Sequence, residues 1–152
     1  MAKKQPKIKS IEETLWESAN KLRGSVEPSE YKHVVLSLIF LKYANDRFEE
    51  RRNELIADGK EAFVDQAVFY NARNVFYLEE QSRWSFIMEN AKQNDIAIKI
   101  DKALESVERS NPSLKGALPS NYYSGLGLDR AKLAALLDEI NKPFCLFNSP
   151  LY

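Results

Sequence analysis

The sequence predicts a mainly α-helical fold, a single domain of five to six helices, and three observations support this prediction. Apolar residues recur every three or four positions along most of the chain, which is the spacing of one face of an α-helix. Proline, glycine and asparagine separate these segments, as they do at helix ends. With 152 residues, 44% of them hydrophobic, the chain is long enough to bury one core.

Charge and cysteine content restrict the classes of function. Lys and Arg number 22, as do Asp and Glu, so any DNA contact must come from local charge rather than from a global field. One cysteine, Cys145, cannot form an internal disulfide, which favours a cytoplasmic location. The first residues lack a secretion-signal pattern, and the longest apolar stretch, 34–41, is too short to span a membrane.

The first helix is predicted after a short basic segment. Residues 1–9 carry four lysines and no acid, which is typical of a flexible arm. Ser10 and Glu13 have the spacing of a capping box, so we expect a helix to start there and to end at Gly24. One face of that helix would carry Ile11, Leu15, Ala19 and Leu22.

A long second helix is predicted from Pro28 to about Leu55. Proline suits the first turn of a helix, and Ser29 follows it. Residues 34–41 are apolar almost all round, which is the pattern of a central helix that is packed on every side. Asp58-Gly59 marks its end.

The segment after the second helix allows two structures. Residues 60–66 suit a short helix. Residues 67–70 and 74–78 are rich in strand-forming residues. The region 67–78 is therefore expected to form either a small β-hairpin or a packed irregular loop.

The rest of the sequence predicts three more helices, with one loop before the last of them. Their limits follow from capping residues and prolines: a helix over 82–90, one from Asn94 or Asp95 to Asn111, a loop over 112–128, and a helix from Asp129 to before Pro143.

Two basic features are candidates for contact with DNA phosphates. Arg47 and Arg51 lie one turn apart on the long helix, where they either clamp phosphates or pair with Glu50 and Glu54. The basic arm either reaches phosphates without reading bases or is a solvated tail. Its candidate residues are Lys3, Lys4, Lys7 and Lys9.

Two tyrosines in a glycine-flanked loop are candidates for contact with a partner protein. Tyr122 and Tyr123 either anchor a partner or face the core.

No residue pattern predicts a catalytic or metal site. His33 has no activated nucleophile near it in sequence, and Cys145 has no partner at metal-ligand spacing. The adjacent pairs 49–50 and 79–80 diverge on a helix, so they are expected to be solvated charge.

Several motifs, in a fixed order, resemble a known family. They are Leu22-Arg23-Gly24, then Phe40-Leu41-Lys42-Tyr43 followed by Asp46, with weaker support from Ser82-Arg83-Trp84 and Leu128-Asp129. From about Ile11 to about Asn141, the chain resembles the N-terminal helical domain of the modification subunit of type I restriction–modification systems, which is a DNA adenine-N6 methyltransferase.

The resemblance implies a complex. Its members would be two modification subunits, one specificity subunit and, for cleavage, restriction subunits. The full-length modification subunit would use S-adenosylmethionine, and this domain would help to clamp DNA and join subunits. The family's cofactor and catalytic motifs are a glycine-rich strand-to-helix turn and an Asn/Asp-Pro-Pro-Tyr/Phe loop that grips a flipped adenine. The nearest segments, 125–127, 111–114 and 148–152, match neither motif.

The expected organisation is a basic arm over 1–9, a helical domain over 10–141, and a tail over 142–152. The tail departs from the family pattern, which continues into the catalytic domain; a truncated reading frame, a frame-shifted one or a chosen segment would each explain it. The first hypothesis is therefore a domain for assembly and DNA clamping. The alternative is a free-standing helical module that binds proteins but no DNA.

Overall fold

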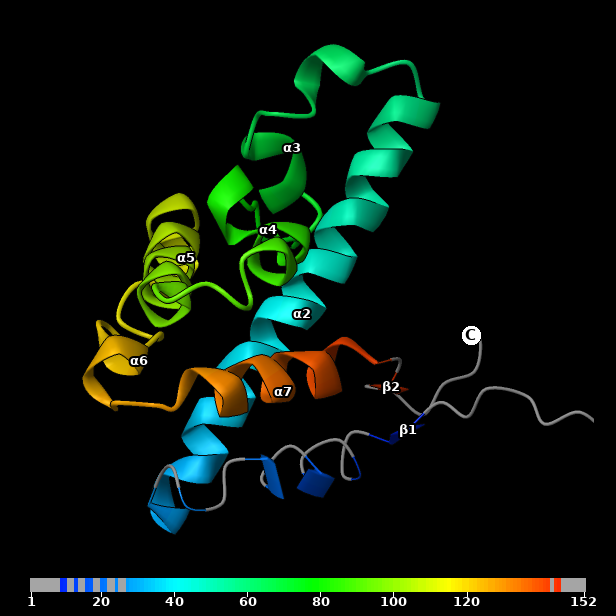
Figure 1. Cartoon of the computed structure of the whole chain (residues 1–152). Helices are drawn as coiled ribbons and strands as arrows, with labels where there is room; N and C mark the ends of the chain where they lie inside the picture. Colours follow the sequence, from blue (N-terminus) through cyan, green and yellow to red (C-terminus); the bar gives the residue numbers. More distant parts are fainter. Residues whose placement is uncertain are drawn as a thin grey trace, which may run out of the picture.

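The computed structural model describes residues 27–142 and 144–145, together with residues 9–10, 13, 16–17, 20–21 and 24. Within these residues lie six α-helices, three short 3-10 helices and one pair of two-residue strands (Figure 1). The prediction of a mainly α fold is therefore confirmed.

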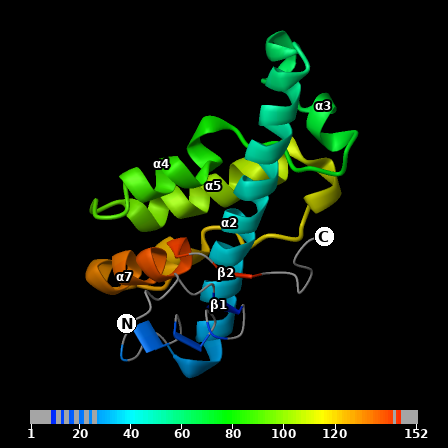
Figure 2. The same ribbon diagram turned by 90° about the vertical axis from the view of Figure 1, so that its right-hand side faces the viewer.

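The helix α2, Pro28–Ala57, is the axis of the domain. Its 30 residues span about 45 Å at 1.5 Å per residue. Figure 2 shows α4 and α5 side by side across α2, with α7 nearer to its N-terminal end. The side chain of Leu36 is 39% exposed, so α2 is not enclosed on every side as its sequence predicts. Its fully buried side chains include Val34, Leu38, Leu41, Phe48 and Leu55.

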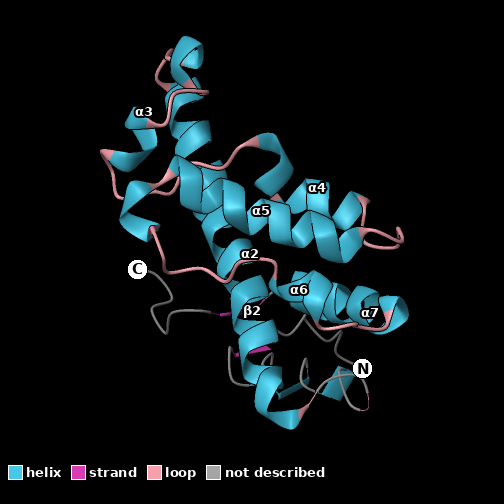
Figure 3. Cartoon of the chain, turned by 90° about the vertical axis from the view of Figure 1, so that its left-hand side faces the viewer, coloured by secondary structure: helices cyan, strands magenta, loops and turns pink. Residues whose placement is uncertain are grey.

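The other elements are shorter, and Figure 3 shows that helices dominate the described chain. In chain order they are η1 Glu61–Phe63, α3 Val68–Asn71, η2 Glu80–Ser82, α4 Trp84–Glu89, α5 Ile96–Ser110, η3 Pro112–Leu114, α6 Tyr122–Gly125 and α7 Arg130–Asn141.

The β-hairpin considered for 67–78 is wrong, and the packed irregular loop is correct only for the residues after α3. This segment forms α3 followed by a loop, with Asn74 at a φ of 60°. The aromatic rings explain the difference, because Tyr70 stacks on Phe48 of α2 with centroids 4.8 Å apart. Tyr77 meets both rings edge-on, at 5.7 Å from Phe48 and 5.2 Å from Tyr70. Burial of these rings against α2 outweighs the local preference for strand.

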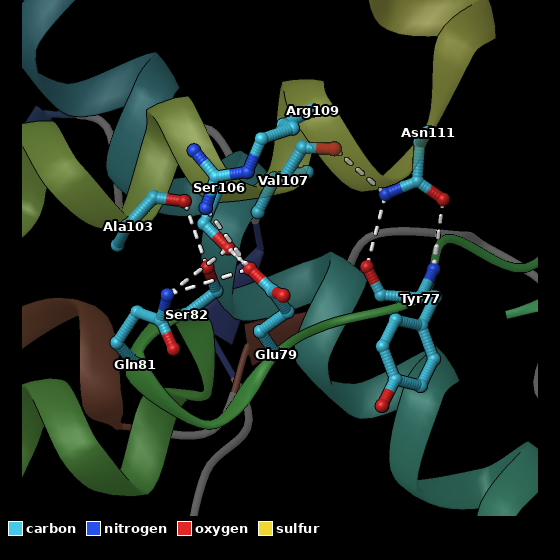
Figure 4. Close-up of polar contacts among 9 residues, drawn as sticks. All are labelled: Tyr77, Glu79, Gln81, Ser82, Ala103, Ser106, Val107, Arg109 and Asn111. Carbon is cyan, nitrogen blue, oxygen red and sulfur yellow. Dashed lines mark hydrogen bonds and ion pairs between the residues drawn. The ribbon is translucent and has the colours of Figure 1, made fainter. Parts of the chain in front are cut away.

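Asn111 and a neighbouring polar cluster fix the loop after Tyr77 to α5 (Figure 4). The Asn111 amide accepts the Tyr77 N–H at 2.9 Å and donates to the Tyr77 carbonyl at 2.9 Å, as a paired strand would. Nearby, the Glu79 carboxylate accepts from the Ser106 hydroxyl and from Arg109 at 3.2 Å. Ser82, which is fully buried, donates to the Ala103 carbonyl at 2.8 Å. The loop therefore has its polar groups satisfied without strand pairing.

The short helices α4 and α6 begin without a cap of their own. Neither Arg83, before α4, nor Asn121, before α6, caps its helix through its side chain. Instead, Asn45 of α2 accepts the Trp84 N–H at 2.9 Å. Asp101 of α5 accepts the Tyr123 and Ser124 N–H groups at 2.8 and 2.9 Å. Side chains from the long helices thus satisfy the free donors at these helix starts.

Two short segments that are far apart in the sequence form a small parallel pair of strands. In β1, Lys9–Ser10, and β2, Phe144–Cys145, Lys9 is opposite Phe144 and Ser10 is opposite Cys145. Most of the predicted first helix lies outside the described residues, but Glu13, Trp16–Glu17 and Asn20–Lys21 are helical. Gly24 has a φ of 81°, as a glycine after a helix end does. The tail beyond Cys145 also lies outside the described residues.

Replacing Asp101→Ala should reduce the free energy of unfolding by about 1–3 kcal/mol, because the buried Tyr123 N–H and the partly buried Ser124 N–H of α6 lose their acceptor. Urea unfolding followed by circular dichroism measures this change. Lys102→Ala, at an exposed position of the same helix, is the matched control and should change little. Equal stability of the two variants would contradict the role of Asp101.

Candidate functional site

Arg47 and Arg51 lie on the C-terminal half of α2 and differ in their surroundings. The side chain of Arg47 is 47% exposed and forms an ion pair with Glu50. The Arg51 side chain is 9% exposed, pairs with Glu54 at 3.1 Å, and donates from Nε to the Phe69 carbonyl at 3.0 Å. The structure thus contains the pairing within the helix that was one of the two sequence alternatives. Contact of these arginines with DNA phosphate stays a prediction.

A third arginine joins this pair from a different part of the chain. Arg73 follows α3, is exposed, and makes no side-chain ion pair within the described part of the chain. It lines a cavity of about 130 Å³ together with Arg47, Glu50, Arg51, Glu54 and Val75. Three guanidinium groups and two carboxylates leave this cavity with a positive excess, which suits an oxygen anion such as phosphate.

Sequence reasoning missed Arg73, and no sequence signal could have found it. Arg73 reaches α2 because Tyr70 packs on Phe48, a tertiary contact that brings α3 back along the long helix.

The basic arm contributes no described side chain. Lys3, Lys4 and Lys7 lie outside the described residues, and Lys9 is described through its backbone in β1. Their contact with phosphates stays a prediction.

The two candidate tyrosines have different surroundings. Tyr123 is fully buried and donates from its hydroxyl to the Val34 carbonyl at 2.5 Å, so the structure selects the core-facing alternative for this residue. Tyr122 is partly buried and donates to the Glu30 carboxylate. Burial raises the pKa of Tyr122, as does this hydrogen bond, so the phenol remains the donor at neutral pH.

Tyr122 also lines an open groove of about 600 Å³ between α2 and the loop at 116–119. Glu30, His33 and Leu36 line the same groove from α2. Tyr122 therefore retains a surface toward solvent, and its contact with a partner stays a prediction.

The remaining sequence candidates do not assemble into a reactive centre among the residues that the structure describes. These residues include no group of three or more His, Cys, Asp or Glu side chains that could hold a metal ion. In the same part of the chain, no helix combines the length and apolar character needed to cross a membrane.

The described residues do not fit S-adenosylmethionine. Gly125 ends the short helix α6, and Gly127 lies in open space, with nothing near enough for a cradle. The family's glycine-rich turn follows a strand of a sheet. Within the described ranges, the strands present are the two-residue β1 and β2. No step of methyl transfer is therefore derived for this chain.

A family model described as the HsdM N-terminal domain matches residues 11–141. The chain belongs to this family. It is also 34% identical, over 147 residues, to the type I restriction enzyme MjaIX methylase subunit of Methanocaldococcus jannaschii. That match covers 87% of this chain and 26% of the relative, so this HsdM N-terminal domain spans about a quarter of the relative's length. The resemblance inferred from the sequence is confirmed.

Replacing Arg51 and Arg47 in turn should distinguish an arginine that stabilises the fold from one that lies at the surface. Arg51→Ala leaves the Phe69 carbonyl without its donor and should lower the free energy of unfolding by about 1–3 kcal/mol. Arg47→Ala removes an exposed ion pair and should stay within about 0.5 kcal/mol of the original protein. Urea unfolding measures both, and a larger loss for Arg47→Ala would refute this assignment.

Proposed function

We propose that this domain joins subunits and clamps DNA in a cytoplasmic type I restriction–modification complex. Its partners would be the specificity subunit, a second modification subunit and, for cleavage, restriction subunits. The full-length modification subunit would methylate adenine N6 with S-adenosylmethionine, and this domain would contribute binding rather than chemistry.

The observation that supports contact with DNA is the convergence of Arg47, Arg51 and Arg73 on one cavity. Guanidinium groups bind phosphate through paired N–H donors, and such contacts position a protein on DNA without reading its sequence. Arg47 and Arg73 are exposed, so a phosphate oxygen can compete with Glu50 for Arg47 and meet Arg73 directly. The lysines of the basic arm would add further contacts of the same kind.

The alternative is a helical module that binds proteins but no DNA. Two observations favour it: the chain has a formal net charge of zero, and Arg47 and Arg51 already pair with glutamates. These ion pairs would have to break before the arginines could bind phosphate, which reduces the free energy gained on DNA binding.

Anisotropy of a labelled DNA duplex at about 50 and 200 mM salt tests the proposal. Each neutralised phosphate contributes about 0.9 to the slope of log affinity against log salt. Replacing Arg73→Ala should weaken binding evenly across sequences and reduce that slope by about 1. Removing the four arm lysines should reduce the slope further.

Lys115→Ala is the control, since it removes an equal charge at an exposed position that is not part of the cavity lining. It should leave the slope unchanged. Absence of binding at both salt concentrations would refute DNA clamping by this domain and support the protein-binding alternative.

A further inference from the structure

The far end of α2 carries an apolar surface that no other described element covers. Here η1 and α3 turn back toward the body of the domain (Figure 1). The side chain of Phe63 is 38% exposed and that of Val68 is 63% exposed. Phe69, half-buried, stacks on Phe63 with ring centroids 4.7 Å apart. These three residues, Phe63, Val68 and Phe69, form what we term the tip patch.

The backbone beneath the tip patch is held in place by two partly buried hydrogen bonds. Arg51 of α2 donates to the Phe69 carbonyl at 3.0 Å. The Tyr70 hydroxyl donates to the Val64 carbonyl at 2.7 Å. Because the patch is already ordered, a partner that covers it would lose little of its binding energy to the ordering of this surface.

The charges around the tip patch indicate what binds there. Asp58, Glu61 and Asp65 are exposed and make no ion pair within the described residues, and Lys60 is the one basic residue between Asp58 and Phe69. Arg51 of α2 also reaches the Phe69 backbone, but its side chain is 9% exposed and its charge is paired with Glu54. This acidic surround repels a phosphate backbone, so the patch does not suit DNA. A partner with apolar side chains flanked by Lys or Arg is complementary to it.

A second copy of this chain is a poor occupant. In a two-fold interface the same patch meets itself, so the acidic residues of one copy would face those of the other. The observations therefore favour a different protein.

We infer that the tip patch docks an amphipathic helix of another subunit, whose apolar stripe is flanked by Lys or Arg. Helices of this kind present apolar anchors at every third or fourth position to an apolar surface. The inference rests on the assembly part of the proposed function and adds to it the surface and the chemistry of the partner. It is separate from DNA contact, which the proposal assigns to the arginine cavity.

Binding of the labelled specificity subunit to the full chain tests this inference. The double variant Phe63→Ser with Val68→Ser should weaken binding at least about tenfold, because central apolar anchors carry most of the energy of an interface. Ile98→Ser is the matched control, since Ile98 is an apolar residue of α5 that is 48% exposed. It should bind as the original chain does. Because Phe63→Ser also removes the stacking on Phe69, the double variant should unfold at a lower urea concentration than the original chain. Its unfolding should stay cooperative and its circular dichroism helical without urea, which separates lost docking from lost folding.

A second probe tests the chemistry alone. A synthetic helical peptide of Leu and Lys, with its leucines on one face, should bind the original chain but not the double variant. Its counterpart of Leu and Glu should bind neither. The inference is overturned if the specificity subunit binds the original chain and the double variant equally tightly, or if the Leu/Lys peptide does not bind the original chain more tightly than the double variant.

The remaining outcomes are also decisive. If the original chain self-associates in sedimentation and the double variant does not, the occupant is a second copy and the inference is wrong. If the specificity subunit fails to bind but the Leu/Lys peptide binds through the patch, the proposed assembly fails and the docking chemistry stands. DNA anisotropy of the double variant should equal that of the original chain, so a failure of DNA clamping is seen separately.

Discussion

Polar side chains of the long helices hold the short helices of this domain in place. α4 and α6 have six and four residues, too few to be stable alone, and neither has its own cap. Asn45 supplies the acceptor for α4, and Asp101 supplies two for α6. Because each acceptor is buried, displacing a short helix would leave unpaired polar groups on both sides of the contact. Asn111 acts in the same way on the loop that follows Tyr77.

This arrangement divides the surface of α2 between different roles. Its N-terminal half packs against α7 and binds the Tyr123 hydroxyl through Val34. Its C-terminal half carries the arginine cavity, and the tip patch lies on η1 and α3, which fold back beside this half. Arg51 connects the last two, since its guanidinium lines the cavity while its Nε holds the Phe69 carbonyl. In our proposals the positive cavity binds a phosphate backbone and the acidic tip binds a basic protein, so the two kinds of partner would meet neighbouring but separate surfaces.

Helix signals were enough to predict the long helices: α5 buries a face that recurs every three or four residues, and α2 follows from the apolar run 34–41 between Pro28 and Asp58-Gly59. Local residue preference was misleading at residues 67–78, where Val, Phe and Tyr favour strands but Tyr70 and Tyr77 bury their rings on Phe48. The arginines of α2 and their glutamate partners follow from helical spacing, whereas Arg73 depends on that same tertiary packing. The choice between surface and core for Tyr123 depends on the Val34 carbonyl, 89 residues away in sequence.

Native-state hydrogen exchange tests the central claim, that side chains of the long helices hold the short ones. The account predicts that the amides of Trp84, Tyr123 and Ser124 exchange as slowly as buried amides of α5, although they lie at helix starts that lack caps of their own. It also predicts that Asn45→Ala speeds exchange at Trp84 and leaves Tyr123 unchanged. Exchange at these three amides as fast as in an unfolded chain would contradict the account.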